Sequence, residues 1–314
     1  MSRMEPPHTT TPISVSACLL ATLVALVGCQ PDTSTDAPGS LVTVEWLSQN
    51  TADSTVVPIH VGSEAVFNEE HIPRASYLSF ADFAVRNDSA TGLRNELPQP
   101  DAMRRRLEAL GVSDDSKIVV YSDNERTLFA TRLLFTLDYL GLGEQSFLLD
   151  GGLVAWKAAG NPVTADLSDT RPGSLSAKPV NELAVDADWI AARMNATGYV
   201  LVDARPHEQY AGAQEQTESR QGHIPGAVNL PLTELYDQDG KMRHAAELER
   251  LFQNAGFTPG DTVVAYCVTG VLATGVTYAA RHLGYEILVY DGSIEDWSAD
   301  PERPLSVSPG SHRR

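Results

Sequence analysis

TVVAYCVTGVLA, residues 262–273, joins a β-branched run to a cysteine, a glycine and the start of an apolar segment. The run Thr262 to Tyr266 suits a buried parallel strand. The segment after Gly270 carries one apolar face at helical spacing, formed by Val276, Ala279, Ala280 and Leu283. A strand that passes through a short loop into a helix is the unit of an open α/β sheet, in which ligands bind at the carboxyl ends of the strands. The stretch therefore predicts an α/β fold with Cys267 at its ligand-binding edge.

The loop from Val268 to Ala273 can turn several backbone N–H groups towards the Cys267 sulfur. Gly270 allows the backbone to turn where a Cβ would clash. Such N–H groups, together with the positive end of the helix dipole, stabilise an anion. We therefore expect the loop to lower the pKa of the Cys267 thiol and to make it nucleophilic near neutral pH. The alternative is a buried, inert cysteine beside a glycine turn.

The region from Leu41 onward contains the same pattern twice. Three segments return in the same order, namely HIPRA at 71–75 as HIPGA at 223–227, IVVYS at 118–122 as VVAYC at 263–267, and LDGG at 149–152 as YDGS at 290–293. Trp156 and Trp297 follow the last segment of each copy, and Ser122 stands in the first copy where Cys267 stands in the second. The repeat has the length of a domain and not of a solenoid unit, so we expect two domains of one fold.

Each copy alternates short apolar strands with amphipathic helices, which predicts crossover connections and a parallel sheet with helices on both faces. Further predicted strands are Ile118–Tyr121, Tyr199–Val202 and Ile287–Tyr290. Further predicted helices carry the apolar faces Met103, Leu107 and Leu110; Leu133, Leu134, Leu137 and Leu140; and Leu248, Leu251, Phe252 and Ala255. A segment rich in Ser, Thr, Asp and Pro separates the copies. We predict a first domain at 41–165, a linker at 166–180 and a second domain at 181–308.

The composition limits the classes of function. A chain of 314 residues with 42% hydrophobic and 20% charged residues suits two soluble globular domains. A formal net charge of −18 argues against nucleic-acid binding, because phosphate contacts need clustered Lys and Arg. The same acidic surface repels anions at long range, so a small anionic substrate needs local compensation at its site.

The first forty residues form a separate region. An apolar run from Ile13 to Gly28 is too short for a typical membrane-spanning helix. Its end, LVGC at 26–29, resembles the lipobox of bacterial lipoproteins. This resemblance implies a signal peptide at 1–28, lipid on Cys29, a tether at 29–40, and export to the cell envelope, on the periplasmic side of the outer membrane in a Gram-negative host. The alternatives are an ordinary signal peptide and an uncleaved anchor.

The three cysteines of the chain have different expected fates. Cys18 would leave with the signal peptide, and Cys29 would carry the lipid. Cys267 would then be the only thiol of the mature domains, which excludes an intramolecular disulfide. A lone thiol in an exported protein calls for a functional reason, so Cys267 is the candidate nucleophile.

Residues 41–306 resemble a tandem rhodanese of the thiosulfate or 3-mercaptopyruvate sulfurtransferase family. The resemblance rests on the two His-Ile-Pro segments, the strand end Asp203-Ala204-Arg205, RQGHIPGA at 220–227, the Tyr266-Cys267 loop, and YDGS at 290–293 followed by Trp297. It implies an inactive first domain and a catalytic Cys267 in the second domain. It also implies a ping-pong cycle, in which Cys267 takes sulfane sulfur from thiosulfate, 3-mercaptopyruvate or a persulfide. The resulting Cys267 persulfide would pass this sulfur to cyanide or a thiol, without a metal or an organic cofactor.

The substrate loop departs from that family's pattern. Val268 and Thr269 stand where thiosulfate-type enzymes carry Arg and Lys, and where mercaptopyruvate-type enzymes carry Gly and Ser. Leu272 and Gln209 each replace an Arg that is frequent among the relatives. The expected substrate-binding residues are Arg205, Arg220, Val268, Thr269, Gly270, Val271, Leu272 and Ala273. Each arginine also has a structural interpretation, as a surface residue or as a partner of Asp203 or Glu218.

Two other classes of function are alternatives to a sulfurtransferase. A phosphatase of related fold needs an Arg six residues after the cysteine, and residue 273 is Ala. A lipid-anchored, non-catalytic binding or sulfur-relay module is the second alternative, which the apolar side chains of Val268 and Leu272 favour. Ser122 is expected to be inert, because no Ser/His/Asp arrangement is evident around it.

Overall fold

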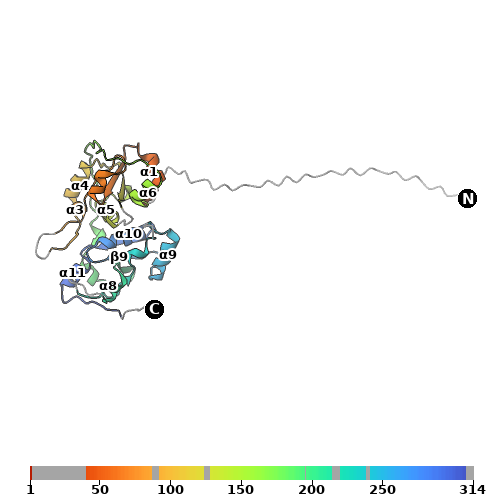
Figure 1. Cartoon of the computed structure of the whole chain (residues 1–314). Coiled ribbons are helices and arrows are strands. Elements are labelled where there is room, and N and C mark those ends of the chain that lie inside the picture. The colour runs from red at the N-terminus through yellow and green to blue at the C-terminus, as the bar shows by residue number, and fades with distance from the viewer. Residues whose placement is uncertain are drawn as a thin grey trace. The chain divides into compact units, whose positions relative to one another are not determined.

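Two parallel β-sheets organise the chain, one in each copy of the sequence repeat (Figure 1). The computed structural model describes Met1 and residues 40–86, 92–123, 128–194, 196–213, 220–237 and 241–308. The strands of the first sheet, in the order β1-β5-β4-β2-β3, are β1 (Leu41–Val42), β2 (Val56–Val61), β3 (Ser76–Tyr77), β4 (Lys117–Ser122) and β5 (Ser146–Leu149). The strands of the second sheet, in the order β6-β10-β9-β7-β8, are β6 (Ala184–Val185), β7 (Tyr199–Asp203), β8 (Val228–Asn229), β9 (Thr262–Tyr266) and β10 (Glu286–Tyr290). The equivalent strand orders confirm the predicted tandem α/β fold.

Helices cover both faces of each sheet. Those of the first domain are α1 (Val44–Asn50), α2 (Glu64–Glu69), α3 (Phe80–Phe83), α4 (Pro100–Ala109), α5 (Leu128–Tyr139) and α6 (Gly152–Ala158), with a 3₁₀ turn η1 (Gly143–Gln145). Those of the second domain are α7 (Ala187–Ala191), α8 (His207–Ala211), α9 (Ala245–Asn254), α10 (Val271–His282) and α11 (Ser293–Ala299), with η2 (Asn181–Leu183) and η3 (Leu232–Glu234). Helix α4 begins with Pro100 in its first turn, where a missing N–H costs nothing. The predicted helices are therefore present with ends close to those expected.

The period of two along strand β9 decides where the cysteine points. Val263, Ala265 and Cys267 belong to one buried cluster, whereas Val264 and Tyr266 belong to another on the opposite face. Alternate residues of a strand project to opposite faces of its sheet, so this division follows from the sequence spacing alone. It places the Cys267 side chain on the face that α10 covers.

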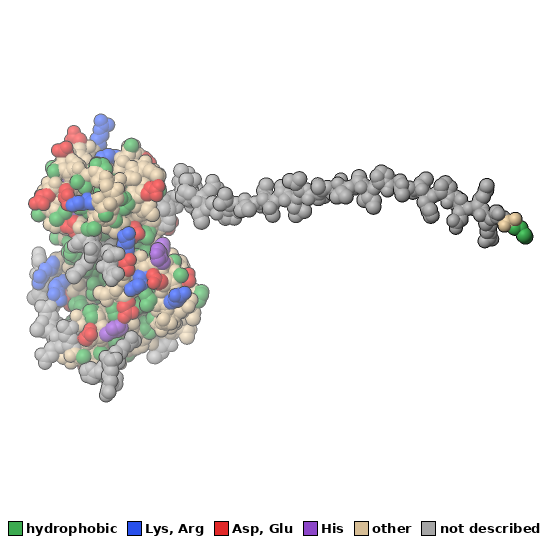
Figure 2. Space-filling view, turned by 45° about the vertical axis from the view of Figure 1, so that its right-hand side comes forward, with side chains coloured by type: hydrophobic (Ala, Val, Ile, Leu, Met, Phe, Trp, Pro, Cys, Tyr) green, Lys and Arg blue, Asp and Glu red, His purple; other side chains and the backbone are tan. Residues whose placement is uncertain are grey.

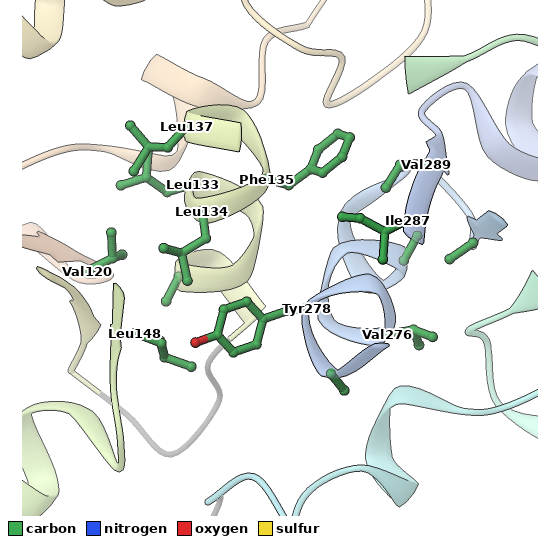
Figure 3. Close-up of a cluster of buried hydrophobic side chains, with 14 of the residues drawn as sticks. Val120, Leu133, Leu134, Phe135, Leu137, Leu148, Val276, Tyr278, Ile287 and Val289 are labelled. Carbon is green, nitrogen blue, oxygen red and sulfur yellow. The ribbon is translucent and has the colours of Figure 1, made fainter. Parts of the chain in front are cut away.

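That face of the second sheet shares its hydrophobic core with the first domain. One cluster joins residues of both domains (Figure 3) and includes Leu134 and Phe135 of α5 with Val276 and Tyr278 of α10. In the close-up, the Phe135 ring extends towards the side of Ile287 and Val289, and the Tyr278 ring extends towards Leu148. Both sheets belong to one compact unit. The first domain is thus a packing partner of the cysteine-bearing domain.

The predicted linker runs without helix or strand along the surface of the first domain. Gly173 N–H donates to the Glu108 carbonyl, and Val180 N–H donates to the Tyr139 carbonyl. The Leu175 side chain is buried. These contacts attach residues 166–180 to α4 and α5, so the linker is held against the first domain.

The predicted signal peptide, the lipobox with Cys29 and nearly all of the predicted tether lie outside the described residues. None of the helices in the described ranges is long and apolar enough to cross a lipid bilayer.

Candidate functional site

A ring of backbone N–H groups surrounds the Cys267 sulfur. The N–H groups of Ala273, Thr269 and Leu272 face it and favour its charged, thiolate form. Gly270 makes this convergence possible with a φ of 79°, at the residue that caps the N-terminus of α10. The ring corresponds to the anion-binding arrangement expected from the sequence, with the helix dipole behind it.

The pKa of the Cys267 thiol differs from the expectation. Cys267 is 1% exposed, and burial raises the pKa of its thiol above the ordinary value. The three N–H groups act in the opposite direction, while the Asp203 carboxylate adds to the rise. The prediction of a lowered pKa is therefore wrong for this closed site, because desolvation outweighs the hydrogen bonds.

The segment that follows β10 holds the cysteine loop in place through Ser293. The Ser293 hydroxyl accepts hydrogen bonds from the N–H groups of Cys267 and Gly270, both at 3.0 Å, and donates to the Tyr290 carbonyl at 2.9 Å. Ser293 is fully buried and has a φ of 55°, which is rare for a residue with a Cβ. The sequence comparison assigned no role to it. The sequence does contain a signal for such a role: Ser293 stands in the cysteine-bearing copy where Gly152 stands in the first copy.

The position of Arg205 favours the structural interpretation. Its guanidinium is fully buried and forms a paired contact with Asp203, with Nε at 2.9 Å from Oδ1 and Nη2 at 2.6 Å from Oδ2. Nη2 also donates to the Gly222 carbonyl. Its Nη1 is buried without a hydrogen-bond partner among the described residues. The positive charge lies close enough to Cys267 for each group to stabilise the charged form of the other.

The Arg220 side chain donates its hydrogen bonds to backbone carbonyls. Nε donates to the Ser298 carbonyl at 3.1 Å, and Nη2 donates to the carbonyls of Asp300 and Arg303 at 2.7 Å. These contacts tie the HIPGA loop to the end of α11. Substrate binding by Arg205 and Arg220 stays a prediction, and the observed contacts favour a structural role for both.

The remaining predicted substrate-binding residues divide into two groups. Val268, Thr269 and Leu272 are partly exposed, so their side chains can meet a ligand. Gly270, Val271 and Ala273 are buried, so they can contribute through the backbone. The exposed part of the loop is therefore apolar except for the Thr269 hydroxyl.

The first domain carries other residues at the positions that correspond to Asp203, Arg205 and Cys267. Strand register pairs His60 with Tyr121 in the first sheet and Asp203 with Tyr266 in the second, so His60 occupies the place of Asp203. By the same register, Gly62 takes the place of Arg205. Together with Ser122 in place of the cysteine, these replacements support the expectation of an inactive first domain.

Other motif residues have structural contacts. The His223 ring lies 2.8 Å from the Tyr210 carbonyl, and the Trp297 indole donates to the Pro304 carbonyl at 2.8 Å. Within the described part of the chain, no three His, Cys, Asp or Glu side chains are grouped so as to hold a metal ion.

Comparison with known proteins identifies the family. The model of the rhodanese-like domain matches residues 43–159 and again residues 186–300. The chain is 36% identical over 249 residues to a probable 3-mercaptopyruvate sulfurtransferase of Pseudomonas aeruginosa, covering 77% of this chain and 86% of that protein. It is 28% identical over 254 residues to a thiosulfate sulfurtransferase of Azotobacter vinelandii, covering 80% of this chain and 91% of that protein.

A solved structure supports the fold at lower identity. The crystal structure of an anaerobic ergothioneine biosynthesis enzyme from Chlorobium limicola matches with a TM-score of 0.75 and 23% identity, covering 86% of this chain and 71% of that one. At this identity the match concerns the fold alone. The two domain matches and the curated relatives together show that the chain belongs to the rhodanese-like family, with two rhodanese-like domains.

Proposed function

We propose that the protein is a sulfurtransferase that carries sulfur as a persulfide on Cys267. The observation that supports this most directly is the ring of three backbone N–H groups around the Cys267 sulfur. Hydrogen bonds to a sulfur stabilise the thiolate and, after transfer, the negative charge of the persulfide. The names of the relatives, which are 3-mercaptopyruvate and thiosulfate sulfurtransferases, support the same reaction class.

The cycle consists of two displacements at sulfur. The Cys267 thiol first gives up its proton to water, and the thiolate attacks the sulfane sulfur of the donor. A new S–S bond forms while the donor's own bond to that sulfur breaks. Sulfite (from thiosulfate), the enolate of pyruvate (from 3-mercaptopyruvate) or a thiolate (from a persulfide) leaves with the electron pair. A nucleophilic acceptor, cyanide or a thiolate, then attacks the outer sulfur, and the Cys267 thiolate leaves.

The rim of the site bears on the choice of donor. The side chains of Val268 and Leu272 are apolar, and the two nearby arginines are held by Asp203 and by backbone carbonyls. Acidic and basic side chains are interspersed over the face shown in Figure 2, within a chain of net charge −18. We propose a small anionic donor whose charge meets backbone N–H groups instead of a cationic side chain. A persulfide is preferred over thiosulfate on this ground.

Intact mass spectrometry after mixing with thiosulfate, 3-mercaptopyruvate or a small persulfide tests this function. We expect the protein to gain the mass of one sulfur atom and to lose it again on addition of cyanide. Cys267→Ser should gain none. Absence of the gain with all three donors would contradict the proposal and favour the non-catalytic binding or relay module, which the apolar rim supports.

We propose in addition that the protein is exported and held at a membrane of the cell envelope by lipid on Cys29. The LVGC sequence at 26–29 supports this. Cys29→Ser should move the protein from the membrane fraction to the soluble fraction, since the acyl chains would then have no attachment point. Cys18→Ser is the matched control and should leave the distribution unchanged. Retention of the Cys29→Ser protein in the membrane fraction would overturn the lipid anchor.

A further inference from the structure

A buried arginine of the first domain reaches the loop that carries Cys267. Arg132 of α5 is fully buried, and its guanidinium contacts Asp291 of the second domain, with Nη1 at 2.6 Å from Oδ1 and Nη2 at 3.4 Å from Oδ2. Nη2 also donates to the Asn95 carbonyl at 2.5 Å. Burying a charged group is costly unless it is paired and hydrogen-bonded. Arg132 therefore fixes the Asp291 carboxylate to the first domain.

The Asp291 carboxylate in turn lies against the turn of the cysteine loop. A Cβ at Gly270 would come within 2.6 Å of Asp291 Oδ1 and within 2.7 Å of its backbone oxygen. Leu97 N–H, from the first domain, donates to Asp291 Oδ2 at 2.8 Å. The residue that gives the loop its left-handed turn is thus in close contact with a carboxylate held by the other domain.

Two further contacts from the first domain reach the neighbouring positions of the loop. The Asn95 side-chain amide donates to the Thr269 hydroxyl at 2.9 Å. Arg94 pairs with Glu295 at 2.5 Å, and Glu295 N–H donates to the Val268 carbonyl at 3.1 Å. The first domain therefore contacts residues 268, 269 and 270 directly or through one residue. The N–H group of Thr269 is itself one of the three that favour the Cys267 thiolate.

The interface contains another ion pair that serves as a comparison. Arg281 of α10 pairs with Asp138 of α5. Arg281 lies ten residues after Val271, which places it about 15 Å further along the helix from the cysteine loop. It joins the same two domains, through α5 and α10, and lies away from the loop. It therefore separates the general effect of an interdomain ion pair from a local effect on Cys267.

We propose that Arg132 and Asn95 of the inactive domain are positioning residues, which hold the cysteine loop so that the N–H groups of Thr269, Leu272 and Ala273 converge on the Cys267 sulfur. This deepens the proposed function, on which it rests only for the role of the persulfide. The convergence of the N–H groups is a property of the free enzyme and can be measured without sulfur transfer.

The test is the pH dependence of Cys267 alkylation by iodoacetamide in the full chain, followed by mass spectrometry of the Cys267 peptide. Asn95→Gly keeps the positive φ of 61° available while removing the contact to Thr269, and it changes no charge. We expect Asn95→Gly and Arg132→Met to raise the apparent pKa of Cys267 by about one unit, which is about a tenfold loss of thiolate at a pH below that pKa. Arg281→Met should lower the melting temperature and leave this pKa unchanged.

The outcomes separate positioning from mere stability. If Asn95→Gly and Arg132→Met lower the melting temperature but keep the pH profile of the wild-type protein, as Arg281→Met should, the positioning role is wrong. If Arg132→Met does not fold, Asn95→Gly decides the question alone. Arg132→Lys should recover part of the shift, because it restores the charge without the paired geometry. Failure of every sulfur donor in the wild-type protein would contradict the proposed function and leave the alkylation result valid.

Discussion

Ser293 and Gly152 occupy equivalent places in the two domains, and both have a φ of 55°. Gly152 adopts this conformation without steric cost, whereas Ser293 bears a Cβ there. The Ser293 hydroxyl compensates by accepting from the N–H groups of Cys267 and Gly270, which would otherwise be buried without that partner. The strain is therefore present only in the domain where a nucleophile has to be held.

Two substitutions at Ser293 distinguish strain from hydrogen bonding. Ser293→Ala keeps the strained φ and leaves two buried N–H groups without their acceptor, so we expect it to lower the free energy of unfolding by about 2 kcal/mol or more. Ser293→Gly loses the same hydroxyl but relieves the strain, and it should be about 1 kcal/mol more stable than the alanine variant. Urea unfolding measures both. An equal loss in the two variants would show that the conformation stores no strain.

At the scale of elements, the strand–loop–helix unit from β9 to α10 could be predicted from the sequence because each part follows a local rule. The β-branched run gives the strand, Gly270 gives the turn, and the spacing of apolar residues gives the helix. The contacts of Asp291 and Arg220 could not be predicted in this way. Their partners lie far away in the sequence, and only the packing of the domains and loops brings them together. The pKa of the Cys267 thiol could not be predicted from the sequence either, because it depends on how completely the fold excludes water from the thiol.

Gly270→Ala tests this unit. The new Cβ would meet Asp291 at 2.6 Å and 2.7 Å, so the loop or Asp291 has to move. We expect the rate of persulfide formation on Cys267 to fall by about tenfold or more, since displaced N–H groups stabilise the thiolate less well. Gly284→Ala is the matched control: its φ is 82° and nothing lies within 4 Å of a Cβ there. It should cost about 1 kcal/mol of stability and leave the rate unchanged. Equal rates in both variants would contradict the account of the loop.

At the scale of the whole molecule, the shared core couples the stability of the two domains. His60, in the first domain, is fully buried among Phe67, Tyr77 and Tyr121, and neither ring nitrogen has a hydrogen-bond partner among the described residues. Burial lowers the pKa of His60 to about 4, although the Asp123 carboxylate partly opposes this. The unfolded chain binds a proton at this residue near pH 6.5, and the folded protein does so only near pH 4.

We therefore expect acid to destabilise the molecule through His60. Stability from the neutral ring is fully present above pH 6.5 and is lost as the pH falls towards 4, by about 3 kcal/mol in total. His60→Leu should reduce the slope of the free energy of unfolding against pH between pH 4 and 6.5. The reduction should correspond to at most one bound proton. Trp156 belongs to the same buried cluster as Phe67 and Tyr121, so tryptophan fluorescence should follow this transition. An unchanged slope in His60→Leu would refute the assignment to His60.

The near-complete enclosure of Cys267 has a consequence for the range of reagents that reach it. With 1% of the residue exposed, we expect a small nucleophile to reach the outer sulfur of a persulfide more readily than a cysteine on the flat surface of another protein does. We expect the same enclosure to hinder cross-linking of Cys267 to other proteins, and the low thiolate fraction of a buried thiol to slow its oxidation by peroxide. The enclosure would thus select reagents by size, and the burial that raises the pKa of the thiol would also protect the thiol from oxidation.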